Sequence, residues 1–241
     1  MPPIASNLQA LSSRIAAAMQ GEPRAVTLVA VSKQQPVEAI RDAYSAGCRD
    51  FGESYVQEAL PKLAALRDLP IAWHFIGHLQ GNKVRDVAAA FDWVHGVDRE
   101  KIAGALARAR PAEKGPLNVC LQVNISGEGT KGGVAPAATG ELAKAVAALQ
   151  RLKLRGLMGM ASATSDPAEQ RRQFALLRAT FDDLVRSGFD LDTLSMGMSQ
   201  DLDAAVAEGA TMVRVGTAIF GERLMHSPSP LGEGRGEGQR L

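Results

Sequence analysis

The feature that most constrains this chain is an eightfold alternation of short apolar segments with longer amphipathic ones. The first apolar segment, residues 27–32, is rich in β-branched residues, which predicts a strand buried on both faces, as in a parallel sheet. Pro36 and Gly47 then bracket an apolar stripe at helical spacing, because proline suits a first helical turn and glycine suits a helix end. Further apolar segments begin near residues 49, 71, 92, 117, 154, 193 and 211.

Strands that alternate with helices pair in parallel through right-handed crossovers. Eight such units in a chain of 241 residues predict a single α/β domain, a (β/α)8 barrel of the TIM type, with a doubly wound open sheet as the alternative. We expect the barrel to occupy residues 1–225 and to carry an extra N-terminal helix, because apolar residues recur at helical spacing from Ile4 to Met19. Residues 226–241 are rich in Gly, Pro and Ser, which predicts a disordered low-complexity tail.

Composition argues against several functional classes. The chain has 27 Lys and Arg against 26 Asp and Glu, whereas nucleic-acid binding requires clustered positive charge. No apolar run reaches the roughly 18 residues of a membrane helix. The two cysteines, Cys48 and Cys120, are too few for a disulfide framework or a zinc site, and they fit a reducing compartment. We therefore expect a cytoplasmic protein that binds neither nucleic acid nor membrane, and we take it to be a monomer.

Lys33 is the first residue with evident chemical potential. It follows the first predicted strand, and the active sites of such barrels lie at the carboxyl ends of the strands. Desolvation beside apolar walls lowers the pKa of an amine, and a neutral amine can attack an aldehyde to form a Schiff base. The alternative is a lysine solvated at the rim of the barrel.

The loops after the seventh and eighth strands form a second candidate site, since this pair of loops often binds phosphate in barrels. Ser199, Gly216 and Thr217 lie there, where small residues let backbone N–H groups approach an anion and hydroxyls add donors. The alternative is ordinary turn chemistry, with Ser199 as a helix N-cap, and Asp201 and Asp203 would repel an anion. A lysine together with a phosphate site suggests a phosphorylated aldehyde, and pyridoxal phosphate fits that description.

Six segments of the sequence carry a resemblance to a known family. They are residues 30–33 (AVSK), 51–58 (FGESYVQE), 73–83 (WHFIGHLQGNK), 122–126 (QVNIS), 194–199 (LSMGMS) and 213–221 (VRVGTAIFG). In this order, across residues 1 to about 223, the chain closely resembles the pyridoxal phosphate homeostasis protein family.

The resemblance implies a barrel like the N-terminal domain of alanine racemase, with pyridoxal 5′-phosphate on Lys33 as an internal aldimine. It also implies that Arg214 faces the pyridine nitrogen and that Ser199, Gly216 and Thr217 hold the phosphate. The implied role is to bind and supply the cofactor in vitamin B6 homeostasis without robust catalysis, with pyridoxal phosphate-dependent apo-enzymes as partners. Because an arginine stays protonated, it cannot take the pyridine proton, and the ring would be a poor electron sink.

Ser54 departs from the family pattern, which usually has asparagine there, a longer side chain with an amide donor and acceptor. Two enzymatic alternatives use a similar lysine: an amino-acid racemase, which needs a second base opposite it, and a Schiff-base aldolase, which needs no bound cofactor. The glycine motif at residues 127–132 does not directly open a helix, as a dinucleotide site requires. His74 and His78 lack a third ligand nearby, so we predict no metal site.

Overall fold

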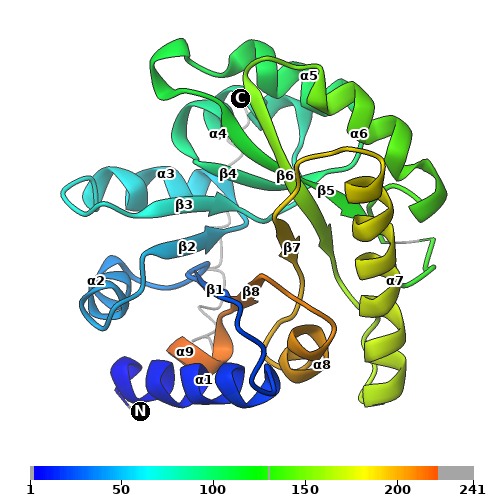
Figure 1. Cartoon of the computed structure of the whole chain (residues 1–241). Helices are drawn as coiled ribbons and strands as arrows, with labels where there is room; N and C mark the ends of the chain where they lie inside the picture. The colour runs from blue at the N-terminus through cyan, green and yellow to red at the C-terminus, as the bar shows by residue number, and fades with distance from the viewer. Residues whose placement is uncertain (1–2, 130, 222–241) are drawn as a thin grey trace, which may run out of the picture.

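The computed structural model describes residues 3–129 and 131–221, so the predicted tail at residues 226–241 lies outside the described residues. In the described part, the strands form one closed parallel barrel in which each strand pairs with the next in sequence and β8 pairs with β1 (Figure 1). The predicted (β/α)8 barrel is confirmed, and the open-sheet alternative is wrong because the sheet has no edge. The strands are β1 (Thr27–Val31), β2 (Asp50–Glu53), β3 (Ala72–Phe75), β4 (Trp93–Val97), β5 (Leu117–Val123), β6 (Leu152–Gly159), β7 (Thr193–Ser195) and β8 (Met212–Val215).

Helices surround the ring of strands (Figure 1). They are α1 (Ile4–Ala18), α2 (Val37–Ser45), α3 (Val56–Ala65), α4 (Val84–Ala90), α5 (Glu100–Ala109), α6 (Thr139–Ala147), α7 (Pro167–Arg186), α8 (Leu202–Ala207) and α9 (Thr217–Phe220), with 3-10 turns η1 (Gly81–Lys83), η2 (Ala112–Lys114) and η3 (Pro136–Ala138).

The extra N-terminal helix is confirmed, and it packs beside α8 and α9 (Figure 1). Its buried side chains are Leu8, Leu11 and Ile15, which belong to the apolar stripe seen in the sequence. The amide of Asn7 also donates to the carbonyl of Ile219 at 2.8 Å. Helix α1 therefore covers the side of the barrel next to α8 and α9, the last two described helices.

Local sequence signals explain where several elements begin and end. Pro36 is the N-cap of α2, and Gly47, just past its end, has φ +108°, a left-handed conformation that glycine adopts without strain. Asp166 caps α7 by accepting the N–H of Ala168 at 3.0 Å. Strand β6 begins at Leu152, before the segment that the sequence predicted.

The two faces of the barrel wall differ in chemistry. Outward-facing side chains such as Phe51, Phe75 and Leu157 are fully buried against the helices. Several inward-facing positions are polar, among them His74 and Ser195, each fully buried. Aliphatic side chains usually fill the interior of such barrels, so the buried polar residues indicate that this interior does more than form a packed core.

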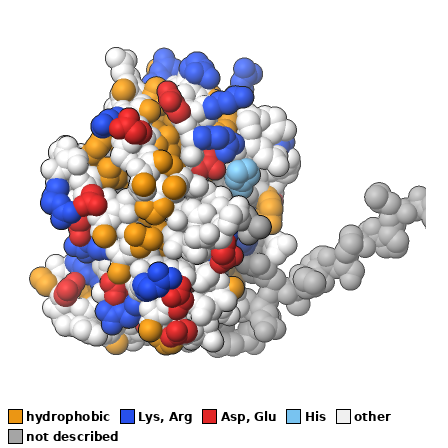
Figure 2. Space-filling model, turned by 90° about the vertical axis from the view of Figure 1, so that its right-hand side faces the viewer, with side chains coloured by type: hydrophobic (Ala, Val, Ile, Leu, Met, Phe, Trp, Pro, Cys, Tyr) orange, Lys and Arg blue, Asp and Glu red, His pale blue; other side chains and the backbone are white. Residues whose placement is uncertain are grey.

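The surface in Figure 2 shows positive and negative side chains interspersed, without a continuous field of one sign. This agrees with the formal net charge of +1. Among the described residues, no helix is long and apolar enough to cross a membrane.

Candidate functional site

Lys33 lies two residues beyond the end of β1 and is half-buried. Val31, on the same face of the alternating strand, adjoins the loop after β8, because a Cβ added at Gly216 would lie 3.1 Å from the carbonyl oxygen of Val31. The pairing of β1 with both β2 and β8 puts Lys33 and Gly216 at the same carboxyl end of the barrel. The structure therefore brings these two predicted site residues together.

A buried ion cluster holds the backbone on both sides of Lys33. Lys62, on α3, donates to the carbonyl of Ser32 at 2.8 Å and to Oε1 of Glu58 at 2.5 Å. The same carboxylate oxygen of Glu58 accepts the backbone N–H of Gln34. Gln34 has φ +61°, which is unusual for a residue with a side chain. The cluster thus fixes a strained turn that presents Lys33.

Glu53 completes this cluster from the end of β2. Its Oε1 accepts the hydroxyl of Ser32 at 2.7 Å and the ammonium of Lys62 at 3.0 Å, and the residue is fully buried. Oε2 is buried without a hydrogen-bond partner in the described residues. Burial raises the pKa of Glu53, and the bonds from Ser32 and Lys62 offset part of that rise.

The loop after β7 approaches β8 closely. Gly197 has φ +94°, and its carbonyl accepts the N–H of Arg214 at 2.9 Å. Ser199 follows it and is half-buried. It is not the N-cap of α8, because that helix begins at Leu202 and the cap residue is Asp201. The N-cap alternative for Ser199 is therefore wrong.

The loop after β8 leads directly into the short helix α9. Gly216 is the N-cap and Thr217 the first helical residue, with an exposed side chain. The first N–H groups of a helix have no intrahelical acceptor and can donate to an anion. Gly216, Thr217 and Ser199 thus lie on adjacent loops at the end of the barrel where Lys33 lies.

The two acids that opposed an anion site are engaged elsewhere. Asp203 forms a two-pronged pair with Arg14, at 2.8 and 2.9 Å. Asp201 accepts the backbone N–H of Met198 at 2.5 Å, and burial raises its pKa. Arg14 also donates to the carbonyl of Ser199 at 3.0 Å, which ties this loop to α1. The repulsion expected from the sequence is therefore weakened.

Arg214 projects from β8 and is only 5% exposed. Its guanidinium donates to the hydroxyl of Ser195 at 2.6 Å and to the carbonyl of Gly159 at 3.1 Å. Burial lowers the pKa of Arg214 to about 10, which leaves it protonated at neutral pH. The site therefore contains a fixed buried cation as well as an amine.

The partners of Arg214 were not predicted from the sequence. His74 had been paired only with His78, but His74 is buried and contacts His95, whereas His78 is exposed. Among the described residues, no three potential metal-ligating side chains gather at one place. A signal was present, since His74, His95 and Ser195 each interrupt an apolar strand at a position of the inward face.

Two further loops adjoin the barrel mouth. The glycine motif at residues 127–132 follows β5 and does not open a helix, since α6 begins only at Thr139. The side-chain amide of Asn124 holds this loop by donating to the carbonyl of Glu128 at 2.9 Å. Ser54 packs its backbone against Gly77, where a Cβ would lie 2.2 Å from the carbonyl oxygen of Ser54.

A cavity of about 1120 Å³ lies between α1, α7 and α8. Its lining includes Arg14 and Asp203 but none of the predicted site residues. The cavity reaches the candidate site only at the Ser199 loop, where Arg14 donates to the carbonyl of Ser199.

The chain matches the family model described as alanine racemase, N-terminal domain, over residues 6–224. A pyridoxal phosphate homeostasis protein from Pseudomonas aeruginosa is 53% identical over 232 residues, which cover 95% of this chain and 100% of the relative. The Escherichia coli protein of that name is 48% identical and covers 92% and 98% of the two chains.

Two solved structures are also similar to this chain. PipY of Synechococcus elongatus, in its structure with PLP bound, has a TM-score of 0.80 and 41% sequence identity, and the match covers 90% of this chain and 99% of that one. D-threonine aldolase from Filomicrobium marinum has a TM-score of 0.72 at 20% identity, over 90% of this chain and 60% of that one, a likeness of fold alone. The chain therefore belongs to the alanine racemase N-terminal domain family and, within it, to the pyridoxal phosphate homeostasis proteins.

Proposed function

We propose that this chain binds pyridoxal 5′-phosphate covalently through Lys33 and supplies it to pyridoxal phosphate-dependent apo-enzymes in vitamin B6 homeostasis. One observation carries the proposal: the closure of β7, β8 and β1 brings an amine, a buried guanidinium and two small-residue loops to one end of the barrel. The names of the Pseudomonas and Escherichia relatives support the role. The PLP held by PipY supports the ligand.

The residues present fit this cofactor. Lys33 offers an amine for the aldehyde, and Ser199, Gly216 and Thr217 offer hydroxyl and backbone donors for the phosphate. Arg214 offers a cationic donor for the ring nitrogen. When bound, the cofactor supplies a conjugated ring that withdraws electrons. Because Arg214 donates rather than accepts a proton, it keeps that ring a weak acceptor, which suits a carrier better than a transaminase.

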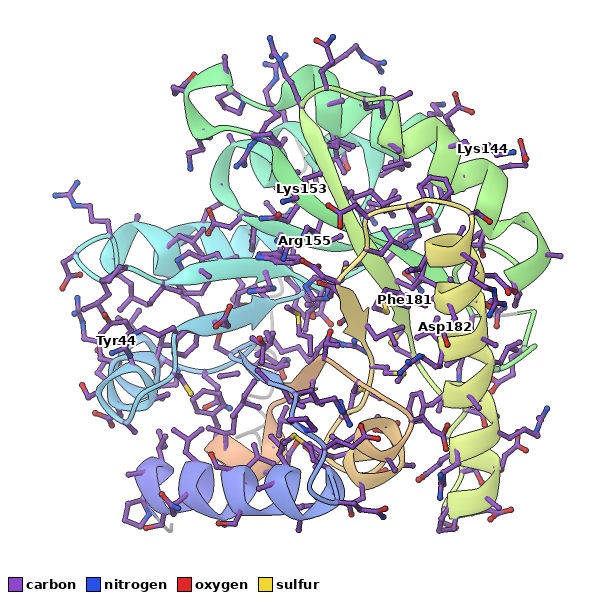
Figure 3. All side chains as sticks on the ribbon, in the orientation of Figure 1. Tyr44, Lys144, Lys153, Arg155, Phe181 and Asp182 are labelled. Carbon is purple, nitrogen blue, oxygen red and sulfur yellow. The ribbon has the colours of Figure 1, made fainter. Side chains whose placement is uncertain are left out.

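The site is best tested by trapping the bond at Lys33. Protein loaded with pyridoxal phosphate is treated with borohydride, digested and mapped by mass spectrometry. The modification should lie on Lys33, and Lys33→Ala should remove both the modification and the visible absorption band. Lys144→Ala is the matched control, since Lys144 is an exposed lysine of α6 (Figure 3) with 68% of its side chain accessible. A variant lacking Lys33 that still carried a reducible adduct would refute the assignment.

The carrier role needs its own measurements. Loaded protein that has been freed of unbound cofactor by gel filtration should restore activity to an apo-enzyme, whereas Lys33→Ala treated in the same way should not, because it lacks the covalent bond that retains the cofactor. An amino-acid racemisation assay of the same preparation should give no rate above that of Lys33→Ala. Turnover that depends on Lys33 would favour the racemase alternative instead.

We also infer that the protein is a monomer in the cytoplasm. Cys48 and Cys120 are both unpaired and buried, which suits a reducing compartment. Light scattering coupled to gel filtration gives the mass directly, and a value near 25.5 kDa is expected. A mass near twice that value would contradict the monomer.

A further inference from the structure

A line of hydrogen bonds crosses the interior of the barrel from β8 to β2. Arg214 donates to the Ser195 hydroxyl at 2.6 Å, which lies 2.8 Å from Nδ1 of His95. Nε2 of His95 lies 2.9 Å from Nδ1 of His74, and Nε2 of His74 lies 3.0 Å from Oδ1 of Asp50. We call this set of residues the interior chain. Its middle members, Ser195, His95 and His74, are fully buried.

The two ends of the interior chain fix the direction of every bond in it. A guanidinium can only donate, and an ionised carboxylate can only accept. Arg214 donates to the Ser195 hydroxyl, and among the described residues Nδ1 of His95 is the one other hydrogen-bond partner of that hydroxyl, so the buried hydroxyl hydrogen is donated to Nδ1 of His95. Nε2 of His95 then carries the proton that it donates to His74.

The hydrogen bonds of His74 run in the same direction as those of His95. Nδ1 of His74 accepts from His95, so Nε2 of His74 carries the proton that it donates to Asp50. Each imidazole is therefore neutral and protonated on Nε2 alone. Burial is the largest cause that lowers the pKa of His95 well below its usual value, and the nearby charge of Arg214 adds to it, which agrees with a neutral His95.

Packing fixes the orientation of His74 in the interior chain. The ring of His74 stacks on Trp93, with centroids 5.3 Å apart and planes 12° apart. The guanidinium of Arg155 lies 4.6 Å from the centroid of the Trp93 ring (Figure 3). Arg155 also pairs with Asp192 at 2.6 Å. These layers hold the imidazole in the orientation that both of its hydrogen bonds require.

The interior chain also helps to stabilise the buried positive charge of Arg214. Isolated buried charges are costly, and within the described residues Arg214 has no carboxylate within 4.0 Å in an ion pair. Successive hydrogen bonds polarise one another in a low-dielectric interior. The charge of Asp201 favours the Arg214 cation, and the aligned hydrogen-bond dipoles that end at Asp50 add to that stabilisation.

We propose that Ser195, His95 and His74 are positioning residues that fix the Arg214 guanidinium as a hydrogen-bond donor toward the ring nitrogen of the bound cofactor. This inference rests on the proposed function for what Arg214 meets. The positions of the protons within the interior chain do not depend on the proposed function, because they follow from contacts between the protein's own residues. The two parts are tested separately.

The order of protons is tested in the protein without cofactor. Long-range ¹H–¹⁵N spectra of ¹⁵N-histidine-labelled protein at pH 7 distinguish the two neutral forms of an imidazole from its cation. His74 and His95 should both be neutral with the proton on Nε2, and His78→Gln should leave their signals in place. A proton on Nδ1 of either residue, or on both nitrogens, would overturn the proposed chain.

The effect on the cofactor is tested by comparing pyridoxal phosphate with its deaza analogue, in which carbon replaces the ring nitrogen. Both retain the aldehyde and the phosphate, so the change in the ratio of their apparent Kd values between the native protein and a variant reports the contact with the ring nitrogen. A hydrogen bond to a charged group contributes roughly 1.5–3 kcal/mol, so the native protein should prefer pyridoxal phosphate by roughly tenfold or more. Ser195→Ala and His95→Gln should lower this preference to within about threefold.

Control variants separate positioning from loss of structure. Thr193→Val removes a buried hydroxyl from the same face of β7 but outside the interior chain, and Ser195→Thr retains the hydroxyl. Both should keep the native preference. An unchanged preference in Ser195→Ala and His95→Gln would refute the positioning role. If neither aldehyde modifies Lys33, the proposed function fails instead, and the spectra still decide the order of protons.

Discussion

Replacing Lys62 with methionine should strongly destabilise the protein, because it leaves the buried carboxylate of Glu53 without its cationic partner. The ammonium of Lys62 contacts the Ser32 carbonyl at 2.8 Å, Glu53 at 3.0 Å and Glu58 at 2.5 Å. Glu53 is fully buried, and Oε2 of its carboxylate already lacks a partner in the described residues. Methionine fills similar space but supplies neither charge nor donors.

The magnitude follows from the burial of Glu53. Removing one partner of a buried ion pair costs roughly 3–5 kcal/mol, more than an ordinary lost hydrogen bond. In a domain of this size each 1 kcal/mol lowers Tm by about 2–4 °C. Lys62→Met should therefore lower Tm by roughly 6–20 °C at pH 7, measured by thermal and urea unfolding. Lys144→Met, which removes an exposed lysine paired with Glu141, is the control and should unfold like the native protein.

The dependence on pH identifies Glu53 as the cause. The pKa of Glu53 is raised in the folded state above its ordinary value of 4.5, so its ionisation opposes folding as the pH rises through that interval. Without Lys62 the folded pKa rises further and the penalty at pH 7 grows. Below the ordinary pKa the carboxyl is protonated in both states and the penalty is absent. The deficit of Lys62→Met relative to the native protein should therefore be smaller at pH 5 than at pH 7.

A second substitution tests the same reasoning from the other side. Glu53→Gln removes the stranded charge, so Lys62→Met combined with Glu53→Gln should be more stable at pH 7 than Lys62→Met alone. A loss under about 1 kcal/mol in Lys62→Met would refute the reasoning, since that is the usual range of a solvated pair. A larger loss that is equal at pH 5 and pH 7 would refute it as well.

Three further predictions concern other parts of the molecule. Ser199→Ala and Thr217→Val should each lower the affinity for pyridoxal phosphate by roughly one to two decades, while changing the affinity for unphosphorylated pyridoxal much less. Spectroscopic titration measures both affinities, and equal losses for the two ligands in folded variants would show that the hydroxyls do not bind the phosphate. Gly197→Ala should destabilise the fold by about 1–3 kcal/mol, because Gly197 has φ +94° and its Cβ would lie 2.6 Å from that of Ala205; urea unfolding measures this, and a native midpoint would contradict it. Burial raises the pKa of Cys120 to about 12, so iodoacetamide at pH 8 should label it only after unfolding, and rapid labelling of the native protein would argue that the thiol is accessible.

Much of the fold could be predicted because its signals are local. The β-branched residues 27–32, with Pro36 and Gly47 after them, mark a strand, a helix and a helix end through the preferences of each residue for its own backbone conformation. Repetition of that unit then limits the topology to very few folds. Ends of elements were less well placed, as at β6, because hydrogen bonding to neighbouring strands decides where a strand begins.

The interior chain could not be predicted in this way, because no local preference specifies its contacts. His95 and Ser195 lie 100 positions apart in the sequence and meet only once the barrel has closed with a particular register. Polarity at an inward position shows that a side chain needs a partner, but it does not show which one. The sequence could therefore indicate that His74, His95 and Ser195 were unusual, and only the three-dimensional structure could connect them.

The two buried networks lie on opposite faces of the barrel wall, and each fixes the position of one of the two groups, Lys33 and Arg214, on which the proposed function depends. Between the sheet and α3, the Lys62 cluster clamps the turn that presents Lys33. Inside the barrel, the chain from Asp50 reaches Arg214. Because the networks share no hydrogen bond, substitutions in one should leave the other intact, and their effects on stability should add to within about 0.5 kcal/mol. The first network holds the backbone on both sides of Lys33 and the second holds the guanidinium of Arg214, so the two groups that would meet the cofactor are positioned independently.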